Sequence, residues 1–284
     1  TRKESSAASD VYKRQLRARS WNTSGPVGVP TRGTTGFNRL RRSDRWLVAQ
    51  PFAQALFRNA VVHEARQPVA VDVGYGASHT TTVEWARWLR RLAPGVEVTG
   101  LEIDESRVLP PRDGVNFALG GFELAGMRAD VVRAFNVLRQ YDEDQVQAAW
   151  EMMRSRLRPG GVIVEGTCDE IGRRSAWVLL DEHGPVSLTL SWDPFDVMRP
   201  SDIAERLPKA LIHRNTPGHR IHDVLRHMDA AWDRAAGLAV FGPRVRWREA
   251  REIFWDATSI SPRLSSHRRL RDNSITLPWS AVCD

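Results

Sequence analysis

Several features that identify particular classes of protein are rare in this chain of 284 residues. Its two cysteines, Cys168 and Cys283, are too few for a disulfide framework or a multi-cysteine zinc site. No apolar run approaches the roughly 20 residues that cross a bilayer, and the first residues do not follow the charged-then-apolar pattern of a secretory signal. We therefore expect a cytoplasmic protein with reduced thiols and no membrane partner.

Sequence patterns for metal binding are also weak. The histidines at positions 213, 219, 222 and 227 have no accompanying carboxylate motif, although His219 and His222 are expected to share a helical face. We predict that the protein has no metal site.

Lysine is scarce, so arginine carries nearly all of the positive charge. Lysine occurs only at positions 3, 13 and 209, and the formal net charge of +7 is spread along the chain. A basic protein can bind nucleic acid, but this even distribution makes a nucleic-acid partner a possibility that is not favoured. Residues 5–15, SSAASDVYKRQ, resemble a translated sequencing adapter, so residues 1–15 are predicted to be a non-native leader.

Alternating strand and helix patterns predict an α/β fold with a mostly parallel sheet. Strands are expected at 69–73, 96–104, 115–119, 129–135 and 161–167, followed by a terminal antiparallel hairpin of 175–181 and 185–192. The predicted organisation has three parts after the leader. These are an N-terminal extension with helices at 16–66, an α/β core at 67–192 and a helical, substrate-side segment at 193–284.

Local signals also predict where helices begin. Ser43 is expected to cap a helix that is interrupted near Pro51 and then resumes. Thr81 and Glu84 match a capping box at the start of the helix after the first strand. The Thr-Pro pair at 216–217 is expected to supply the cap and the first residue of a C-terminal helix.

The stretch VDVGYGASHTTT at 71–82 places an acidic residue and two glycines directly after a buried strand. A phosphate-binding P-loop requires G-x-x-x-x-G-K-[ST], and this stretch contains no lysine. A dinucleotide fingerprint requires a third glycine, where this chain has His79. The remaining pattern is D-x-G-x-G, accompanied by Glu102 at the end of the second strand. A carboxylate there can accept both hydroxyls of a ribose, in NAD as in other nucleosides.

This D-x-G-x-G stretch, Glu102 and the segment LRPGGVIVEGT at 157–167 together resemble the class I S-adenosylmethionine-dependent methyltransferases. The resemblance covers about residues 69–192 and implies a Rossmann-like sheet, S-adenosylmethionine as cofactor and methyl transfer as the reaction. The family often has a polar residue after the third strand for the adenine amino group, where this chain has Gly121 and Phe122. The residues expected to bind the cofactor are Asp72, Gly74, Tyr75, Gly76, Glu102, Ile103, Gly121, Phe122 and Asn136.

The segment FNVLRQY after the fourth strand is expected to face the methyl acceptor. Enzymes that methylate base amines resemble each other in an N-P-P-Y or D-P-P-Y motif here, but this chain lacks the two prolines, so base methylation is not inferred. We predict Asn136, Arg139 and Tyr141 as catalytic residues. The carboxylates of EGTCDE at 165–170 could supply a general base, although attack on a sulfonium methyl group does not require one.

The N-terminal stretch RGTTGFNRLRRSDRW at 32–46 is expected either to be a solvated helix start or to form a lid with an arginine that binds an anionic group. The methyl acceptor is undetermined, with a small molecule favoured, and the protein is expected to be a monomer or homodimer. Two alternatives remain open. The chain could be a non-catalytic interaction or regulatory protein with the methyltransferase fold, or an RNA-binding or RNA-modifying protein.

Overall fold

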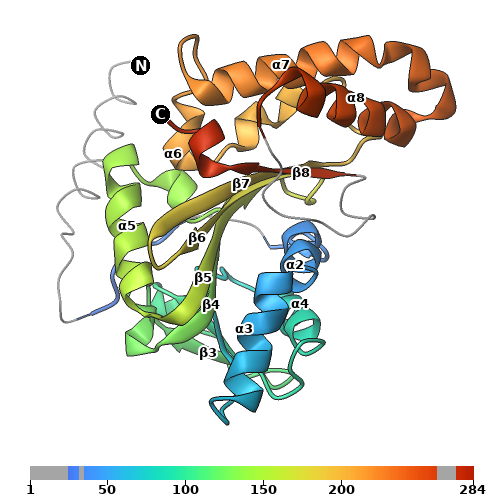
Figure 1. Ribbon diagram of the computed structural model, residues 1–284. Helices are drawn as coiled ribbons and strands as arrows, with labels where there is room; N and C mark the ends of the chain where they lie inside the picture. The colour runs from blue at the N-terminus through green and yellow to red at the C-terminus, as the bar shows by residue number, and fades with distance from the viewer. Residues whose placement is uncertain (1–24, 32–34, 261–272) are drawn as a thin grey trace, which may run out of the picture.

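A computed structural model describes residues 25–31, 35–260 and 273–284, arranged around one eight-stranded sheet (Figure 1). The strand order is β3-β2-β1-β4-β5-β6-β7-β8. The predicted leader, residues 1–15, lies outside the described residues. The strands are β1 (Val69–Val73), β2 (Glu97–Glu102), β3 (Asn116–Leu119), β4 (Ala129–Phe135), β5 (Leu157–Cys168), β6 (Arg174–Asp181), β7 (Gly184–Trp192) and β8 (Ser274–Pro278).

The first five strands are parallel, which confirms the predicted Rossmann-like sheet. The order β3-β2-β1-β4-β5 reverses direction between β1 and β4, and open α/β sheets bind ligands at the carboxyl ends of their strands at such a point. β1 and β4 are almost entirely buried because helices cover both of their faces. The fold therefore directs attention to the loops after β1, β2 and β4.

The remaining strands continue the sheet in antiparallel fashion. β6 and β7 form the predicted hairpin, and β6 also pairs with β5. β5 begins at Leu157, four residues before the predicted start at 161, because Leu157 already pairs with Ala129 across a bulge. β8 was not predicted from the sequence. It is a five-residue strand near the end of the chain that pairs with β7, so its formation depends on a contact distant in sequence.

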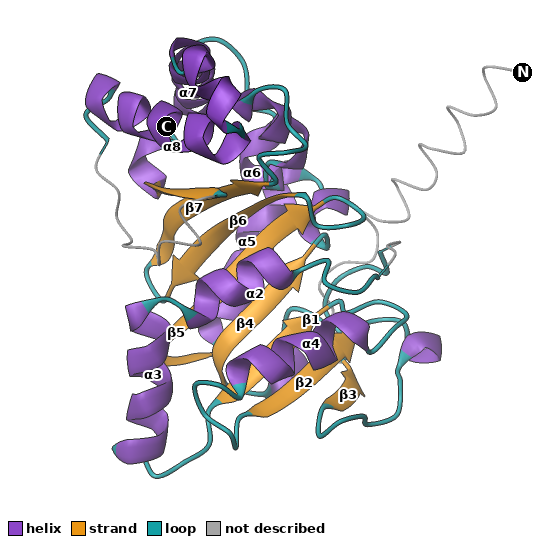
Figure 2. Ribbon diagram, turned by 90° about the vertical axis from the view of Figure 1, so that its right-hand side faces the viewer, coloured by secondary structure: helices purple, strands orange, loops and turns teal. Residues whose placement is uncertain are grey.

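Helices pack on both faces of the sheet and enclose two apolar cores (Figure 2). One face carries α2, α3 and α4, whose buried residues join a core that includes Trp46, Trp85 and Trp177. The other face carries α5 and the C-terminal helices, with Trp150, Trp192 and Trp247 in their core. The helices are α2 (Arg41–Val48), α3 (Pro51–Val62), α4 (Thr80–Leu89), α5 (Glu143–Ser155), α6 (Lys209–Ile212), α7 (Arg220–Arg234) and α8 (Pro243–Ala257).

Three predicted helix starts were wrong, and two of the residues expected to form caps bond to other groups instead. Ser43 lies inside α2, where its hydroxyl donates to the Leu40 carbonyl oxygen at 2.9 Å. The Glu84 carboxylate accepts hydrogen bonds from the Asn38 amide at 2.9 and 3.1 Å, so it ties the N-terminal segment to α4 instead of forming a capping box. α7 begins at Arg220, after the Thr-Pro pair at 216–217. The break before Pro51 is confirmed.

Among the described residues, none of the helices combines the length and the apolar character that a membrane span needs.

Candidate functional site

The loop after β1 makes a tight turn that requires its glycines. Gly74 and Gly76 have positive φ angles of 70° and 80°, and a Cβ atom on Gly74 would lie 2.5 Å from Cγ2 of Val137. The Gly74 amide donates to the Leu101 carbonyl oxygen at 2.8 Å. The turn therefore brings bare backbone to the carboxyl end of β1, as the sequence predicted for a site that approaches a ligand closely.

Glu102 ends β2 beside this turn, with a buried carboxylate. One oxygen, Oε2, accepts a hydrogen bond from the Gly76 amide at 3.1 Å. The other, Oε1, accepts from the amides of Ile103 at 3.0 Å and Asp104 at 3.2 Å. Three backbone donors thus fix the carboxylate at the junction of the glycine turn and β2. The structure places Glu102 next to Gly76, where the sequence predicted a contact with a ribose.

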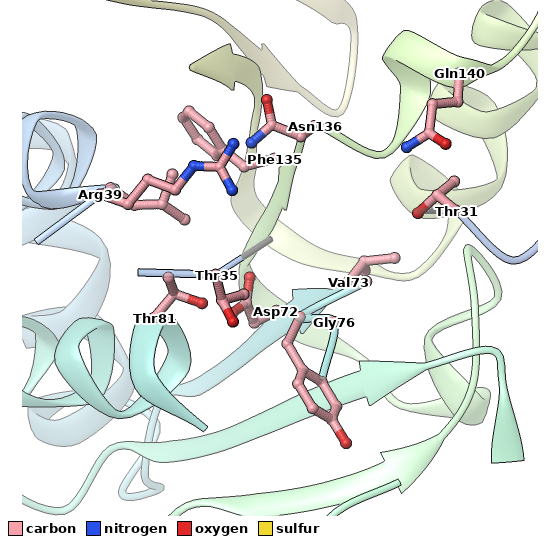
Figure 3. A pocket seen from close by; sticks show the side chains of 13 residues that line it. Thr31, Thr35, Arg39, Asp72, Val73, Gly76, Thr81, Phe135, Asn136 and Gln140 are labelled. Carbon is pink, nitrogen blue, oxygen red and sulfur yellow. The ribbon is translucent and has the colours of Figure 1, made fainter. Parts of the chain in front are cut away.

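A small cavity lies above the glycine turn (Figure 3). Its volume is about 50 Å³, well below the roughly 300 Å³ of the smallest typical ligand pockets. Thr31, Thr35 and Arg39 from the N-terminal segment line it, together with Asn136 and Gln140 from the segment that follows β4. The Arg39 side chain is buried, so this segment contributes a cation to the cavity.

Asp72 also lines the cavity, but its carboxylate belongs to a buried ion cluster. Arg133 on β4 donates to both oxygens of Asp72, at 2.9 and 2.6 Å, and to Asp44 of α2 at 2.8 Å. The hydroxyl of Thr82 donates to Asp72 at 2.7 Å, and the Arg133 guanidinium stacks on Trp85. Asp72 therefore holds α2, α4 and β4 together at the base of the site.

One guanidinium faces two carboxyl groups in this cluster, so its charges balance only when one of the two carboxyls holds a proton. Burial opposes the charge on Arg133, but the ion pairs with Asp72 and Asp44 raise its pKa above the ordinary value. Burial raises the pKa of Asp44, against the opposing effect of Arg133. The cluster is a structural element whose three members come from separate parts of the chain.

The side chain of Tyr75 points away from the cavity. Its hydroxyl donates to the Arg107 carbonyl oxygen and accepts from the Leu109 amide, both at 2.9 Å. The ring packs edge-on against Phe117. Tyr75 can therefore contribute to the site only through its backbone, and its side chain fixes the loop after β2.

The crevice beside β2 and β3 is filled by residues 27–29 of the N-terminal segment. Gly28 lies against Ile103 and Phe122, since a Cβ atom on Gly28 would be 3.2 Å from Cδ1 of Ile103 and 3.4 Å from Cε2 of Phe122. The Phe122 amide donates to the Val27 carbonyl oxygen at 2.9 Å. Ile103, Gly121 and Phe122 thus lie close together, and this segment covers them.

Glu123 belongs to the same crevice and was missed in the sequence. Its Oε2 accepts from the Val27 amide at 2.6 Å, and its Oε1 accepts from the Gly121 amide at 2.8 Å. The signal that could have found it was the acidic residue in GGFE, one position beyond the stretch expected beside adenine. Glu123 is thus a polar group next to Gly121 and Phe122, held in place by two backbone amides.

Asn136 follows β4 with a positive φ of 61° and lines the cavity. Its side chain bridges to the end of β5, because Oδ1 accepts from the Cys168 amide at 2.9 Å and Nδ2 donates to the Cys168 Sγ at 3.3 Å. Cys168 is buried, and burial raises the pKa of its thiol. Asn136 therefore joins the ends of β4 and β5 and also lines the cavity.

Arg139 and Tyr141 follow Asn136 in the segment after β4 and make different contacts. Burial lowers the pKa of Arg139, and the neighbouring Arg206 lowers it further. The Nη1 atom of Arg139 is buried with no hydrogen-bond partner among the described residues. The Tyr141 hydroxyl accepts from the Val29 amide at 2.5 Å, and burial raises the pKa of Tyr141 to about 12. Tyr141 thus contacts the N-terminal segment in this structure.

The carboxylates after β5 do not converge on the site. Glu165 is buried with no hydrogen bond to either oxygen within the described part of the chain, and burial raises its pKa to about 8. Asp169 accepts from the amides of Ile171, Arg173 and Arg174 and so shapes the β5–β6 turn. Glu170 is 72% exposed and lies 3.9 Å from Arg206. The expectation that these carboxylates share the mouth of the site was therefore wrong for Glu165.

No protein-family model and no curated protein matches this sequence. Solved structures with a similar arrangement include the CMeT domain of a citrinin polyketide synthase. It is 18% identical in sequence, the match covers 38% of this chain and 31% of that chain, and the TM-score is 0.31. Human N-acetylserotonin methyltransferase in complex with SAM is 22% identical over 43% of this chain and 35% of that chain, with a TM-score of 0.30. The plantazolicin methyltransferase BpumL, in complex with SAH, is 12% identical, with 46% and 49% of the two chains covered and a TM-score of 0.32. The chain spans no more than half the length of these three structures. The fold assignment rests on the strand order described above.

Proposed function

We propose that this protein is a methyltransferase that binds S-adenosylmethionine and transfers its methyl group to a nucleophile on a small molecule. The observation that carries the proposal is the pairing of the positive-φ glycine turn with Glu102, whose carboxylate is held 3.1 Å from the Gly76 amide at the carboxyl ends of β1 and β2. Ligands of open α/β sheets bind at this end, and an acidic residue after β2 suits the two hydroxyls of a ribose.

The residues present fit such a cofactor. A side chain at position 74 would clash with Val137, so glycine leaves the backbone accessible to a ligand at this point. Gly74 and Gly76 would hold the amino-acid end, Glu102 the ribose, and Ile103 and Phe122 the adenine. When bound, the cofactor supplies a methyl group on a sulfonium ion, which is already a good leaving group.

Arg39 would supply a positive charge for the carboxylate at the amino-acid end of the cofactor. Its buried guanidinium lines the cavity above the glycine turn, and a carboxylate is the natural ligand of a desolvated arginine. Arg39 would then be the arginine of the lid that was one of the two interpretations of 32–46, of which residues 32–34 lie outside the described part of the chain. Asp72 would act indirectly, by fixing the turn through Arg133 and Thr82.

The chain's contribution to the reaction would be positioning and exclusion of water. Neither carboxylate nearest the end of β5 would serve the acceptor as a base, since Glu165 is buried and does not line the cavity and Asp169 shapes a turn. Alignment of the acceptor with the methyl group can supply much of the rate enhancement without a general base. Asn136 and Arg139 would face the acceptor, and Arg139 has a buried donor atom, Nη1, to offer it.

A non-catalytic protein with this fold is the second candidate. The observation that favours it is the filled crevice, because residues 27–29 cover Ile103 and Phe122. Titration calorimetry with S-adenosylmethionine and S-adenosylhomocysteine tests the proposed function. We expect both to bind at a single site. Binding of neither would contradict the methyltransferase proposal.

Replacing Glu102 with glutamine should weaken S-adenosylmethionine binding by about 1–3 kcal/mol, because a charge-assisted hydrogen bond to the ribose is lost. Calorimetry on both proteins measures the difference. The matched control is Glu97→Gln at the exposed, opposite end of the same strand, which should leave the affinity unchanged. Equal affinity of Glu102→Gln and the unaltered protein would assign Glu102 a purely structural role.

A further inference from the structure

The N-terminal segment at 27–29 makes a defined set of polar contacts in the crevice. The backbone of Val27 bonds twice, because its carbonyl oxygen accepts from the Phe122 amide at 2.9 Å and its amide donates to Glu123 at 2.6 Å. Val29 bonds twice to Tyr141, donating to its hydroxyl at 2.5 Å and accepting from it at 3.2 Å. The segment is therefore seated by its backbone, which any ligand with the same hydrogen-bonding edge could replace.

Where the N-terminal segment meets the loop after β3, only glycine fits on each side, at Gly28 and at Gly121. A Cβ atom on Gly121 would lie 2.1 Å from the Val27 carbonyl oxygen, and one on Gly28 would lie 2.8 Å from the Tyr141 hydroxyl. Gly28 also has a φ of 137°, which residues with side chains rarely adopt. A planar group of main chain thus lies between the Ile103 side chain and the Phe122 ring, where two bulky side chains could not fit.

The bonding edge of Val27 matches that of an adenine base. Val27 presents one acceptor and one donor side by side, to the Phe122 amide and the Glu123 carboxylate. The Watson–Crick edge of adenine presents a ring-nitrogen acceptor beside an amino donor, and proteins recognise bases by hydrogen bonds to this edge. The second oxygen of Glu123 is held by the Gly121 amide, so the pair of groups is preorganised.

We propose that residues 27–29 occupy the adenine position of the cofactor site and compete with the cofactor for it. This inference rests on the proposed function, since it uses the nucleoside position assigned there. Glu123 and the Phe122 amide would then be the groups that recognise adenine once the segment leaves. The cavity that remains beside the segment, about 50 Å³, would hold only part of the amino-acid end of the cofactor.

Competition of this kind lowers the apparent affinity by the fraction of molecules in which the site is open. The segment also bonds outside the crevice, where Arg107 Nη1 donates to the Thr31 carbonyl oxygen at 3.0 Å. That contact offers a place to hold the segment near the site after it has been displaced. Through this competition, cofactor binding would depend on the release of residues 27–29 from the crevice.

The test is calorimetry with S-adenosylhomocysteine on the full chain, comparing the unaltered protein with Gly28→Val and Gly25→Val. A valine at position 28 would meet the Tyr141 hydroxyl and adopt a strained φ, so it should expel the segment. We expect at least tenfold tighter binding for Gly28→Val. Gly25→Val is the matched control, because nothing lies within 4 Å of a Cβ there, and it should bind as the unaltered protein does.

Hydrogen exchange on the unaltered protein gives a second readout. S-adenosylhomocysteine should speed exchange of the Val27 and Val29 amides, because displacement breaks their bonds to Glu123 and Tyr141. Equal affinity of the three proteins, or slower exchange of both amides on binding, would contradict competition while leaving the proposed function intact. Failure of all three proteins to bind would contradict both proposals.

Discussion

Replacing Arg133 with methionine should lower the free energy of unfolding by about 3–5 kcal/mol, the largest effect expected for any single substitution considered in this protein. The guanidinium is 1% exposed and bonds Asp72 at 2.6 Å and Asp44 at 2.8 Å. A methionine of similar volume would leave two buried carboxylates without a counter-ion, and the cost of an uncompensated buried charge far exceeds the gain of the pair itself. Urea denaturation followed by circular dichroism measures the change.

The control for this prediction is Arg87→Met on α4. Arg87 also pairs with an aspartate, Asp113 at 3.2 Å, but the two side chains are 66% and 49% exposed. An exposed ion pair contributes about 0–1 kcal/mol, so this variant should unfold nearly as the unaltered protein does. Similar losses in the two variants would show that burial of the Arg133 cluster is not what makes it important.

Replacing Glu165 with glutamine should make the protein more stable than the unaltered chain at pH 8 and leave the two almost equally stable at pH 4. Burial raises the pKa of Glu165 from 4.5 to about 8 in the folded state. A group whose pKa is higher in the folded state than in the unfolded state stabilises the fold fully below its unfolded pKa. This stabilisation is lost as the pH rises through the pKa of the folded state. The difference should amount to about 3 kcal/mol between pH 5 and pH 8, measured by thermal or urea unfolding across that range.

Because glutamine does not titrate, the difference between the two proteins isolates Glu165 from every other ionisable group. The control is Glu151→Gln on the exposed side of α5, next to Trp150 in sequence, which should show the same pH dependence as the unaltered protein. Parallel stability curves for Glu165→Gln and the unaltered chain would mean that the Glu165 carboxyl is solvated or paired in solution.

The parts of the fold that sequence could predict are those governed by local patterns. Apolar runs bounded by polar turns predicted β1 to β7, and the D-x-G-x-G stretch predicted a glycine turn beside Glu102. Each of these depends on residues near one another in the chain or on the known order of parallel strands. The fifth strand began earlier than expected because Leu157 pairs across a bulge, which no local pattern indicates.

The remaining features depend on contacts between distant residues. Asp72 seemed a cofactor ligand in the sequence, but Arg133, 61 residues away, bonds both of its oxygens. The segment at 27–29 meets Glu123 and Tyr141 across 96 and 112 residues, so nothing in its own Val-Gly-Val sequence indicates where it lies. Side-chain direction was a further difficulty. The sequence placed Tyr75 and Glu165 near the right strand ends, but it could not predict that both side chains turn away from the cavity.

The central claim is that the glycine turn and Glu102 form the seat of S-adenosylmethionine. A crystal structure with bound S-adenosylhomocysteine tests it most directly. The account predicts the ribose hydroxyls within hydrogen-bonding distance of the Glu102 carboxylate, with the amino-acid end over Gly74 and Gly76. A nucleoside bound elsewhere, or a Glu102 that contacts only the amides of Gly76, Ile103 and Asp104 as it does now, would contradict it.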